Sequence, residues 1–547
     1  MHLDKLPVDF DLNVSSDRVL AGFVFVSARH RYACAESLIG AGFGGMTMGS
    51  LSRSLFDDGL RWIWIGDDPN RLRLIDGQLL DERSRICQTL DNEGCTCPNL
   101  RSWLEPITGL LPIAPVSGAT PALPSDQDLI AGVSDVGLVP GSSRPDPLLE
   151  AAAALLDRPE LRGAGKALSF AGHGSYLGLM SGLSETGLPG FDLRFDHEAL
   201  YMQMAAAGVV AAAIGSSAIA RHWWPLEVDR NAFLERALEL ASSVVDTATV
   251  VHGLTSHRSP QRNYRVLVAR DIDPHESASS APPPAMLVRG LPSGLISAFD
   301  AYMREALSLT LDPYATGQPT LHTMLAWTGA HSGLEAVAST YDQPGGSIMV
   351  PFAARALLEE AGRTHWRYSV SDADFELRAT RFFDEYRAAR KKAIGLFQGD
   401  GVSVRAAEGF FTPPSYVDRS GAPDAASPGR IPLPPIAEML NELGARYAEP
   451  GWLTVAYSLL SQSTHATPLG LMHTLSVKPD GGLHAGELSP EMTALALDVA
   501  CTASSVTLGV AALALSNVSD DAQDFRLRLA SASIVVHDAS RMVHGLD

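Results

Sequence analysis

The sequence predicts an all-α protein made of two similar helical bundles, related by an internal duplication and packed about a pseudo-twofold axis. Two observations predict this fold. Apolar residues recur at three- and four-residue steps through long windows, which is the spacing of a helix with one buried face. Landmark residues also occur twice, in the same order, in the two halves of the chain.

The repeat is clearest in residues 168–184 and 460–476. Both segments begin with Leu-Ser, carry a histidine four residues after the serine and continue into Leu-Gly-Leu-Met, and their offset is 460 − 168 = 292 residues. Earlier in the chain, Arg53 lies over Arg355 at an offset of 355 − 53 = 302 residues. We therefore expect that one segment was copied and fused, leaving two matching scaffolds.

Each half contains the same series of expected helices. In the first half they lie near residues 16–40, 46–66, 70–90, 146–157, 163–184, 197–222 and 229–253. In the second half they lie near residues 319–341, 347–369, 372–397, 433–447, 452–476, 489–516 and 521–545. One additional helix is expected at 291–311, and alternating strand patterns are short and scattered.

The same landmarks set the expected domain boundaries. The first repeat covers residues 1–255 and the second covers residues 291–547, with a Pro-, Ser- and charge-rich linker at 256–290. Pro- and Gly-rich segments near 95–145 and 398–432 interrupt the two repeats at equivalent places. Loops of that length in a compact domain are commonly covers over a functional site.

Composition limits the classes of function. The 547 residues include 62 acidic and 42 basic side chains, which gives a formal charge of −20. Hydrophobic residues make up 46% of the chain, which is enough to form a packed core and excludes a disordered protein. The acidic balance argues against nucleic acid as a partner, because phosphate backbones are bound by clustered Lys and Arg.

Compartment and membrane association follow from local features. The five cysteines form a sparse, odd-numbered set, which is typical of an intracellular protein with reduced thiols. The N-terminus lacks a basic start followed by an apolar run, so we expect no secretory signal. The most apolar stretch, Met204–Ala220, is rich in Ala, Gly and Ser and shorter than the roughly 20 residues that a spanning helix needs. We predict a cytoplasmic protein with no membrane partner.

The first candidate site is an acidic helix. Arg53, Asp57 and Asp58 lie within two turns of one helix, with aromatic and aliphatic neighbours that indicate burial. The second repeat carries the same chemistry at Arg355, Glu359 and Glu360. Two interpretations remain open: structural ion pairs between i and i+4, or carboxylates that point into the bundle as bases or metal ligands, with the arginines holding them or an anionic ligand.

The second candidate site is a serine followed four residues later by a histidine. Ser169 and His173 form this pair in the first repeat, and Ser461 and His465 form it in the second. At this spacing on a helix the hydroxyl and the imidazole share one face. A nucleophilic serine would need an orienting carboxylate and an oxyanion pocket, and no Gly-x-Ser-x-Gly elbow precedes either serine. Structural hydrogen bonding and an acid–base or metal-binding histidine are the alternatives.

A divalent metal is a further interpretation. The other duplicated histidines are His30 with His331 and His252 with His544. Cysteines 87, 95 and 97 cluster, but their spacing is not that of a standard zinc knuckle, and loop thiols are the simpler interpretation. The run from Asp520 to Asp524 has the form of an Asp-rich Mg²⁺–diphosphate motif at the start of an expected helix, where acidic residues are favourable in any case.

The Arg-x3-acidic helix followed by the Leu-Ser-x3-His helix resembles a family of uncharacterised bacterial all-helical proteins grouped with abortive-infection and HEPN-like proteins. The resemblance covers the core of each half and implies an all-helical fold. HEPN ribonucleases use an Arg-x4–6-His motif, and the match to it here is Arg270-x4-His275, within the linker.

The sequence therefore predicts a soluble duplicated protein with a buried His/carboxylate/Arg site that binds a small molecule or metal. Acid–base catalysis is expected at Asp57, Asp58 and His173, or at Glu359, Glu360 and His465, with Arg53, Arg355, Ser169 and Ser461 as ligand-binding residues. The alternatives are an RNA-acting defence or toxin protein and a non-enzymatic helical scaffold. The oligomeric state does not follow from the sequence.

Overall fold

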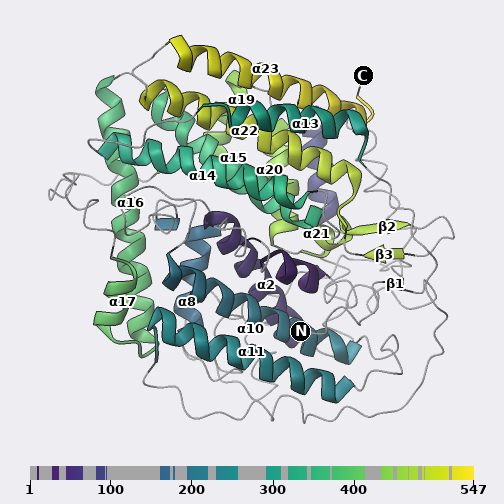
Figure 1. Ribbon diagram of the computed structural model, residues 1–547, viewed down its shortest axis with the longest axis vertical. Helices are drawn as coiled ribbons and strands as arrows, with labels where there is room; N and C mark the ends of the chain where they lie inside the picture. The colour runs from purple at the N-terminus through teal and green to yellow at the C-terminus, as the bar shows by residue number, and fades with distance from the viewer. Residues whose placement is uncertain are drawn as a thin grey trace.

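A computed structural model describes the chain in segments. These are residues 9–10, 27–35, 38, 45–65, 82–92, 94, 160–172, 177–178, 194–219, 230–256, 291–309, 318–341, 346–369, 372–412, 433–447, 452–465, 467–477, 483–485, 487–515 and 520–546. Helices dominate these residues, which confirms the all-α prediction (Figure 1). One small antiparallel sheet accompanies them.

The helices with both ends defined agree in position with the expected ones except within residues 398–432 and 452–476. They are α2 (Gly45–Ile65), α8 (Glu160–Gly172), α10 (Phe195–Ile219), α11 (Arg230–His252), α13 (Ser293–Ala306), α14 (Gln318–Thr340), α15 (Val350–Tyr368), α16 (Asp372–Gly399), α17 (Val404–Phe410), α19 (Ile436–Tyr447), α20 (Trp452–Thr464), α21 (Pro468–Met472), α22 (Pro490–Leu515) and α23 (Asp520–Val543). A 3-10 turn, η3 (Gly346–Met349), leads into α15. The sheet has the order β1 (Asp9–Phe10), β3 (Leu483–Ala485), β2 (Leu475–Val477).

The expected helix over 452–476 is interrupted. Helix α20 ends at Thr464, and a new helix, α21, starts at Pro468. Proline lacks the N–H that would continue the first helix, and the Thr467 hydroxyl caps the second by accepting from the Gly470 N–H at 3.2 Å. A side chain at Gly470 would overlap the Gln462 carbonyl, so the chain turns tightly here.

The expected loop at 398–432 is also wrong in part. Helix α16 continues to Gly399, and α17 occupies residues 404–410. Ser403 caps α17 by accepting from the Ala406 N–H, and Gly401 adopts a positive φ of 92° at the turn between the two helices. The equivalent insertion at 95–145 lies outside the described residues, as do the linker from residue 257 to residue 290 and its Arg270 and His275.

The first half is built around helix α2 packed on α10, with α11 against the other side of α10 and α8 against α2 (Figure 1). Glycines make the central contact close. A Cβ at Gly59 would overlap the carbonyl of Gly208, and a Cβ at Gly208 would overlap the backbone of Leu55 and Phe56. The small residues of the apolar stretch in α10 therefore serve helix packing.

The second half is built around α15 packed on α22, with α23 on the outer side of α22 and α20 against α15. Helices α14 and α13 complete this bundle (Figure 1). Among the described residues, only α10 and α22 contain segments long and apolar enough to cross a membrane. About four-fifths of each segment is buried inside the protein (78% and 83%), which is typical of the core helix of a soluble protein.

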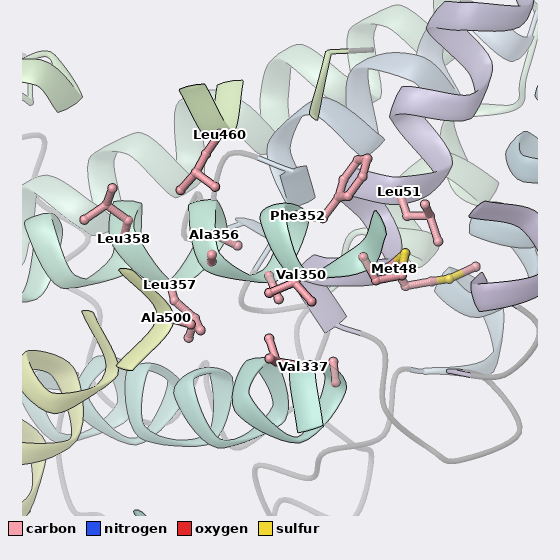
Figure 2. Packing of buried hydrophobic residues seen from close by; sticks show 14 of the residues in the cluster. Met48, Leu51, Val337, Val350, Phe352, Ala356, Leu357, Leu358, Leu460 and Ala500 are labelled. Atoms are coloured by element: carbon pink, nitrogen blue, oxygen red, sulfur yellow. The ribbon is translucent and has the colours of Figure 1, made fainter. Parts of the chain in front are cut away.

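The two halves meet at the N-terminal ends of α2 and α15. Figure 2 shows Met48 and Leu51 of α2 close to Val350 and Phe352 of α15, with Val337 of α14 beside them. All five side chains are buried in one hydrophobic core that spans both halves. Burial of this apolar surface holds the halves together.

Helix α16 extends the second half across the first (Figure 1). At its end, the Asp400 carboxylate accepts from the Gly163 N–H of α8 at 3.0 Å. Helix α17 follows, and its Phe410 ring stacks on His197 of α10 with a centroid separation of 4.1 Å. In the opposite direction, the carboxylate of Glu82, in the helical residues 82–92, accepts from the Leu469 N–H of α21 at 3.0 Å. Each half thus supplies one carboxylate to the other half. That carboxylate accepts a hydrogen bond from a backbone N–H near the start of a helix.

Candidate functional site

Two buried polar clusters lie on α15. Glu359 and Glu360 are consecutive, so their side chains leave the helix about 100° apart and reach different neighbours. Both are almost completely buried. A buried carboxylate requires polar partners, and the two glutamates find different ones.

The Arg355 cluster contains Arg355, Glu359, Tyr457, Thr464 and His465. The Arg355 Nε lies 3.2 Å from a Glu359 carboxylate oxygen, one turn along the same helix. Its Nη2 donates to the Tyr457 hydroxyl at 3.4 Å, and its Nη1 donates to the Thr464 hydroxyl at 2.5 Å. The Tyr457 hydroxyl donates to Glu359 at 3.1 Å and closes the network. One guanidinium therefore ties α15 to α20.

The Arg355 cluster reaches the surface through His465. This residue follows the last residue of α20 and is exposed, and its Nε2 lies 3.1 Å from Arg355 Nη1. Since arginine only donates, this nitrogen is the acceptor of the hydrogen bond. Burial and the neighbouring Glu359 raise the pKa of Tyr457, which keeps its hydroxyl protonated as a donor. The predicted partners Arg355, Glu359 and His465 are thus brought together.

The Glu360 cluster lies on another face of α15 and contains Glu360, Thr364, His322, Arg363 and Arg367. The Thr364 hydroxyl donates to Glu360 Oε1 at 3.2 Å, and His322 Nε2 of α14 lies 4.0 Å from the same oxygen. Glu360 Oε2 has no hydrogen-bond partner among the described residues. His322 packs on the Phe382 ring of α16 at 4.6 Å between centroids.

The electrostatics of the Glu360 cluster favour a neutral acid beside a neutral base. Burial raises the pKa of Glu360 to about 7, and the nearby Arg363, Thr364 and Arg367 only partly oppose that rise. Burial, together with the positive charges of Arg367 and Arg363, lowers the pKa of His322 well below its ordinary value. A carboxyl that titrates near neutral pH is suited to give and take protons.

The first half pairs both of its carboxylates with arginine. Arg53 Nε lies 2.6 Å from Asp57, and its Nη1 donates to the Gly165 carbonyl of α8 at 2.5 Å. Asp58 is fully buried and forms an ion pair with Arg31, which also donates to the Ser54 hydroxyl at 2.6 Å. These contacts correspond to the structural interpretation of the acidic helix, since each carboxylate is neutralised.

Only the second of the two serine–histidine pairs lies entirely within the described residues, and its two side chains are not hydrogen-bonded to each other. Ser169 is half-buried on α8, and His173 lies outside the described residues. The buried Ser461 hydroxyl has no hydrogen-bond partner among the described residues, so it does not bond to His465. The His465 backbone N–H donates to the Ser461 carbonyl at 3.0 Å, which closes the last turn of α20.

The remaining duplicated histidines have structural surroundings. His252 Nε2 contacts Gln203 Oε1 at 2.5 Å, and its Nδ1 accepts from the Leu254 N–H at 3.0 Å. Burial lowers the pKa of both His331 and His544 to about 4, so both rings are neutral. Half-buried His30 lies in the helical residues 27–35.

The part of the chain that the structure describes holds no group of three or more His, Cys, Asp or Glu side chains arranged for a metal ion. Cys87 is a free thiol in the helical residues 82–92, and Cys95 and Cys97 lie outside the described residues. Asp520 and Asp521 occupy the first turn of α23.

Sequence reasoning missed His322, Arg31 and Tyr457. His322 has no counterpart in the first repeat, where the position 301 residues earlier is Ala21, so a search for duplicated residues passes over it. Arg31 and Tyr457 lie on helices that only the folded chain brings to α2 and α15. The sequence does contain one indication of His322: a histidine two residues after Gln-Pro-Thr, near the start of an apolar helix, is a candidate buried base.

No family model, curated protein or solved structure matches this chain significantly.

Proposed function

We propose that the second half of this protein contains an acid–base site that binds a small polar molecule and exchanges a proton with it through Glu360. One observation carries the proposal. A completely buried carboxyl, whose pKa is about 7, lies 4.0 Å from the neutral imidazole of His322, with two arginines nearby. A structural carboxylate in such a position is usually paired with arginine, as Asp58 is with Arg31.

The roles follow from the charges. Glu360 is the proton donor or acceptor, and His322 is the second base, at a distance that one polar atom of a ligand would bridge. Arg363 and Arg367 supply positive charge for an anionic group of the ligand. The Arg355 cluster positions α15 against α20 and provides the exposed His465 at the protein surface.

We further propose that the two halves are copies of one ancestral bundle. In this proposal the first copy has kept the helical scaffold but not the acid–base site. Helix boundaries support it: α8 and α20 differ by 452 − 160 = 292 and 464 − 172 = 292 residues at their two ends. Helices α11 and α23 are each followed within two residues by a glycine with positive φ, Gly253 at 68° and Gly545 at 72°. Met48 and Val350, which are 302 residues apart, lie near each other in Figure 2, and this supports a pseudo-twofold axis between the halves.

The cellular setting in this proposal is the cytoplasm, and the partner is a small molecule. The buried positions of α10 and α22 support a soluble protein, and the net charge of −20 disfavours nucleic acid.

The proposal is tested with the Glu360→Gln variant, which keeps the shape of the side chain and removes its proton. Purified protein is incubated with a small-molecule cell extract, separated by gel filtration and analysed by mass spectrometry for retained compounds. We expect the wild-type protein to retain or convert a compound, with a pH midpoint near 7, and Glu360→Gln to lose this activity. Glu438→Gln, at an exposed position on α19, is the control. A folded Glu360→Gln protein that retains or converts the same compound equally well would contradict the proposal.

The Glu360→Gln variant also tests whether the Glu360 carboxyl keeps its proton up to neutral pH. Glu360 ionises at about 4.5 in an unfolded chain and at about 7 in the protein, so its contribution to stability is complete below pH 4.5 and is lost as the pH rises through 7. Relative to Glu360→Gln, the free energy of unfolding of the wild type should fall by about 3 kcal/mol across this range. Denaturant unfolding at pH 4.5 and pH 8 measures the difference, and equal differences at both pH values would show an ordinary ionised carboxylate.

A further inference from the structure

Helix α23 carries a line of exposed apolar side chains along its outer face. Leu527, Ile534, Val535 and Met542 are 64%, 60%, 55% and 76% exposed. The inner face of the helix is buried through Phe525, Leu529 and Val536 against the rest of the bundle. Single exposed apolar residues are common on proteins, but four on one helix face form an apolar stripe, here with Ser531 and Asp538 between them.

The corresponding face of α11 is polar. The residues 292 positions earlier are Glu235, Ser242, Ser243 and Val250, and only the last is apolar. The two helices occupy matching places on the outer sides of α10 and α22. The architecture therefore does not require an apolar outer face, and the stripe is a property of α23.

The spacing of the stripe is symmetric. Leu527 and Met542 are equidistant from a point between residues 534 and 535, and so are Ile534 and Val535. The polar residues on the same face, Ser531 and Asp538, are centred on the same point. In an antiparallel helix pair with a two-fold axis through that point, each apolar residue therefore meets an apolar residue of the other copy.

We propose that α23 is the interface of an antiparallel homodimer, in which the stripe packs on the same stripe of a second copy of this chain. Leu527 then faces Met542, Ile534 faces Val535, and Ser531 faces Asp538 across the two-fold axis. The charges fit this arrangement, because Asp538 meets a hydroxyl instead of a second carboxylate. A parallel pair would instead place Asp538 against Asp538.

The size of the exposed face of α23 determines the expected affinity of the dimer. Helix α23 has 24 residues and is about 36 Å long at 1.5 Å per residue. An interface one helix wide lies at the small end of specific protein contacts, so we expect a dimer that dissociates in the micromolar range.

The first test is the oligomeric state of the full chain, measured by sedimentation equilibrium from low- to high-micromolar concentration. We expect a monomer–dimer equilibrium that Val535→Glu weakens by more than about tenfold, because it places a charge in the apolar contact. Ser243→Glu, at the matching position on α11, is the control and should leave the equilibrium unchanged. Met542→Glu is a second disruptive variant at the most exposed position. A wild-type monomer at every concentration, or a dimer that both α23 variants leave intact, would overturn the proposal.

The second test determines the orientation of the helices. We expect a mixture of Ser531→Cys and Asp538→Cys proteins to form the mixed disulfide, because these positions face each other in the antiparallel pair. Disulfides of Ser531→Cys with itself as the main product would overturn this orientation. The stripe would instead be a lipid-binding surface if the wild-type chain stays monomeric and floats with phosphatidylglycerol vesicles while Val535→Glu does not.

Discussion

At the scale of single residues, the protein buries charged groups in pairs. Asp498 is the clearest case in the second half, because it lies on the apolar helix α22 and is only 2% exposed. Its carboxylate accepts from His537 Nδ1 of α23 at 2.9 Å. This hydrogen bond and the negative charge of Asp498 raise the pKa of His537, although burial opposes the rise. The pair fastens α23 to the bundle.

This pair predicts a pH dependence of stability. A histidine whose pKa is raised by folding stabilises the protein fully below its unfolded pKa, near 6.5, and this stabilisation is lost as the pH rises through the folded value. We therefore expect His537→Gln to lower the free energy of unfolding more at pH 6 than at pH 9. Urea unfolding at the two pH values measures this, and Asp498→Asn should remove the same pH dependence. A loss that is equal at both pH values would mean that His537 is neutral in the folded protein.

The sequence predicts the interactions of single residues only where the same residue types occur at matching positions in both halves of the chain. The duplicated arginines and carboxylates indicated both acidic clusters, because Arg53 with Asp57 and Arg355 with Glu359 are local pairs one turn apart. The sequence does not distinguish the roles of Asp58 and Glu360. Their difference depends on Arg31 and His322, which reach them from other helices.

At the scale of elements, helix positions follow from apolar periodicity, and helix ends follow from local chemistry that periodicity does not contain. The end of α20 was expected too late because the pattern of spacing continues beyond it. At α20, Pro468 and the Thr467 cap override the periodicity. The short strands β2 and β3 have only three residues each, too few for an alternating pattern to be recognised.

The close contact of α2 and α10 gives a prediction at this scale. Gly208→Ala would place a methyl group against the backbone of Leu55 and Phe56, which cannot move away without separating the helices. We expect it to lower the free energy of unfolding by about 1–3 kcal/mol, the usual cost of overpacking. Gly395→Ala on α16 is the control, because its methyl group meets nothing within 4 Å and should stabilise the helix by about 1 kcal/mol. Thermal or urea unfolding compares the two, and a neutral Gly208→Ala would show that the two helices adjust easily.

At the scale of the whole molecule, the halves depend on each other. Helices α16 and α17 belong to the second half in sequence, yet they contact α8 and α10 of the first. The internal repeat predicted two bundles, but it contains no information on how one bundle reaches across the other. That contact is made at the end of α16, where the Phe397 ring lies against Gly163 and Asp400 accepts from the Gly163 N–H.

The stacking of Phe410 on His197 tests this dependence. Phe410 is 3% exposed, so Phe410→Ala should lower the stability by about 3 kcal/mol and loosen α17 from α10. Limited proteolysis is the measurement, and we expect cleavage near α17 to become faster than in the wild type. Phe195→Ala removes a ring that is 83% exposed and should change neither property. Unchanged proteolysis of Phe410→Ala would show that α17 is held by other contacts.

The reach of α16 and α17 into the first half also affects synthesis on the ribosome. Helices α8 and α10 are complete once residue 219 has been made, but the segment that covers them ends near residue 412. At about 5–20 residues per second, the intervening 412 − 219 = 193 residues take roughly 10–40 seconds to translate. During that interval the nascent first half exposes the apolar surface that Phe397 and Phe410 later cover. This is the interval in which a chaperone that binds unfinished chains can bind that surface.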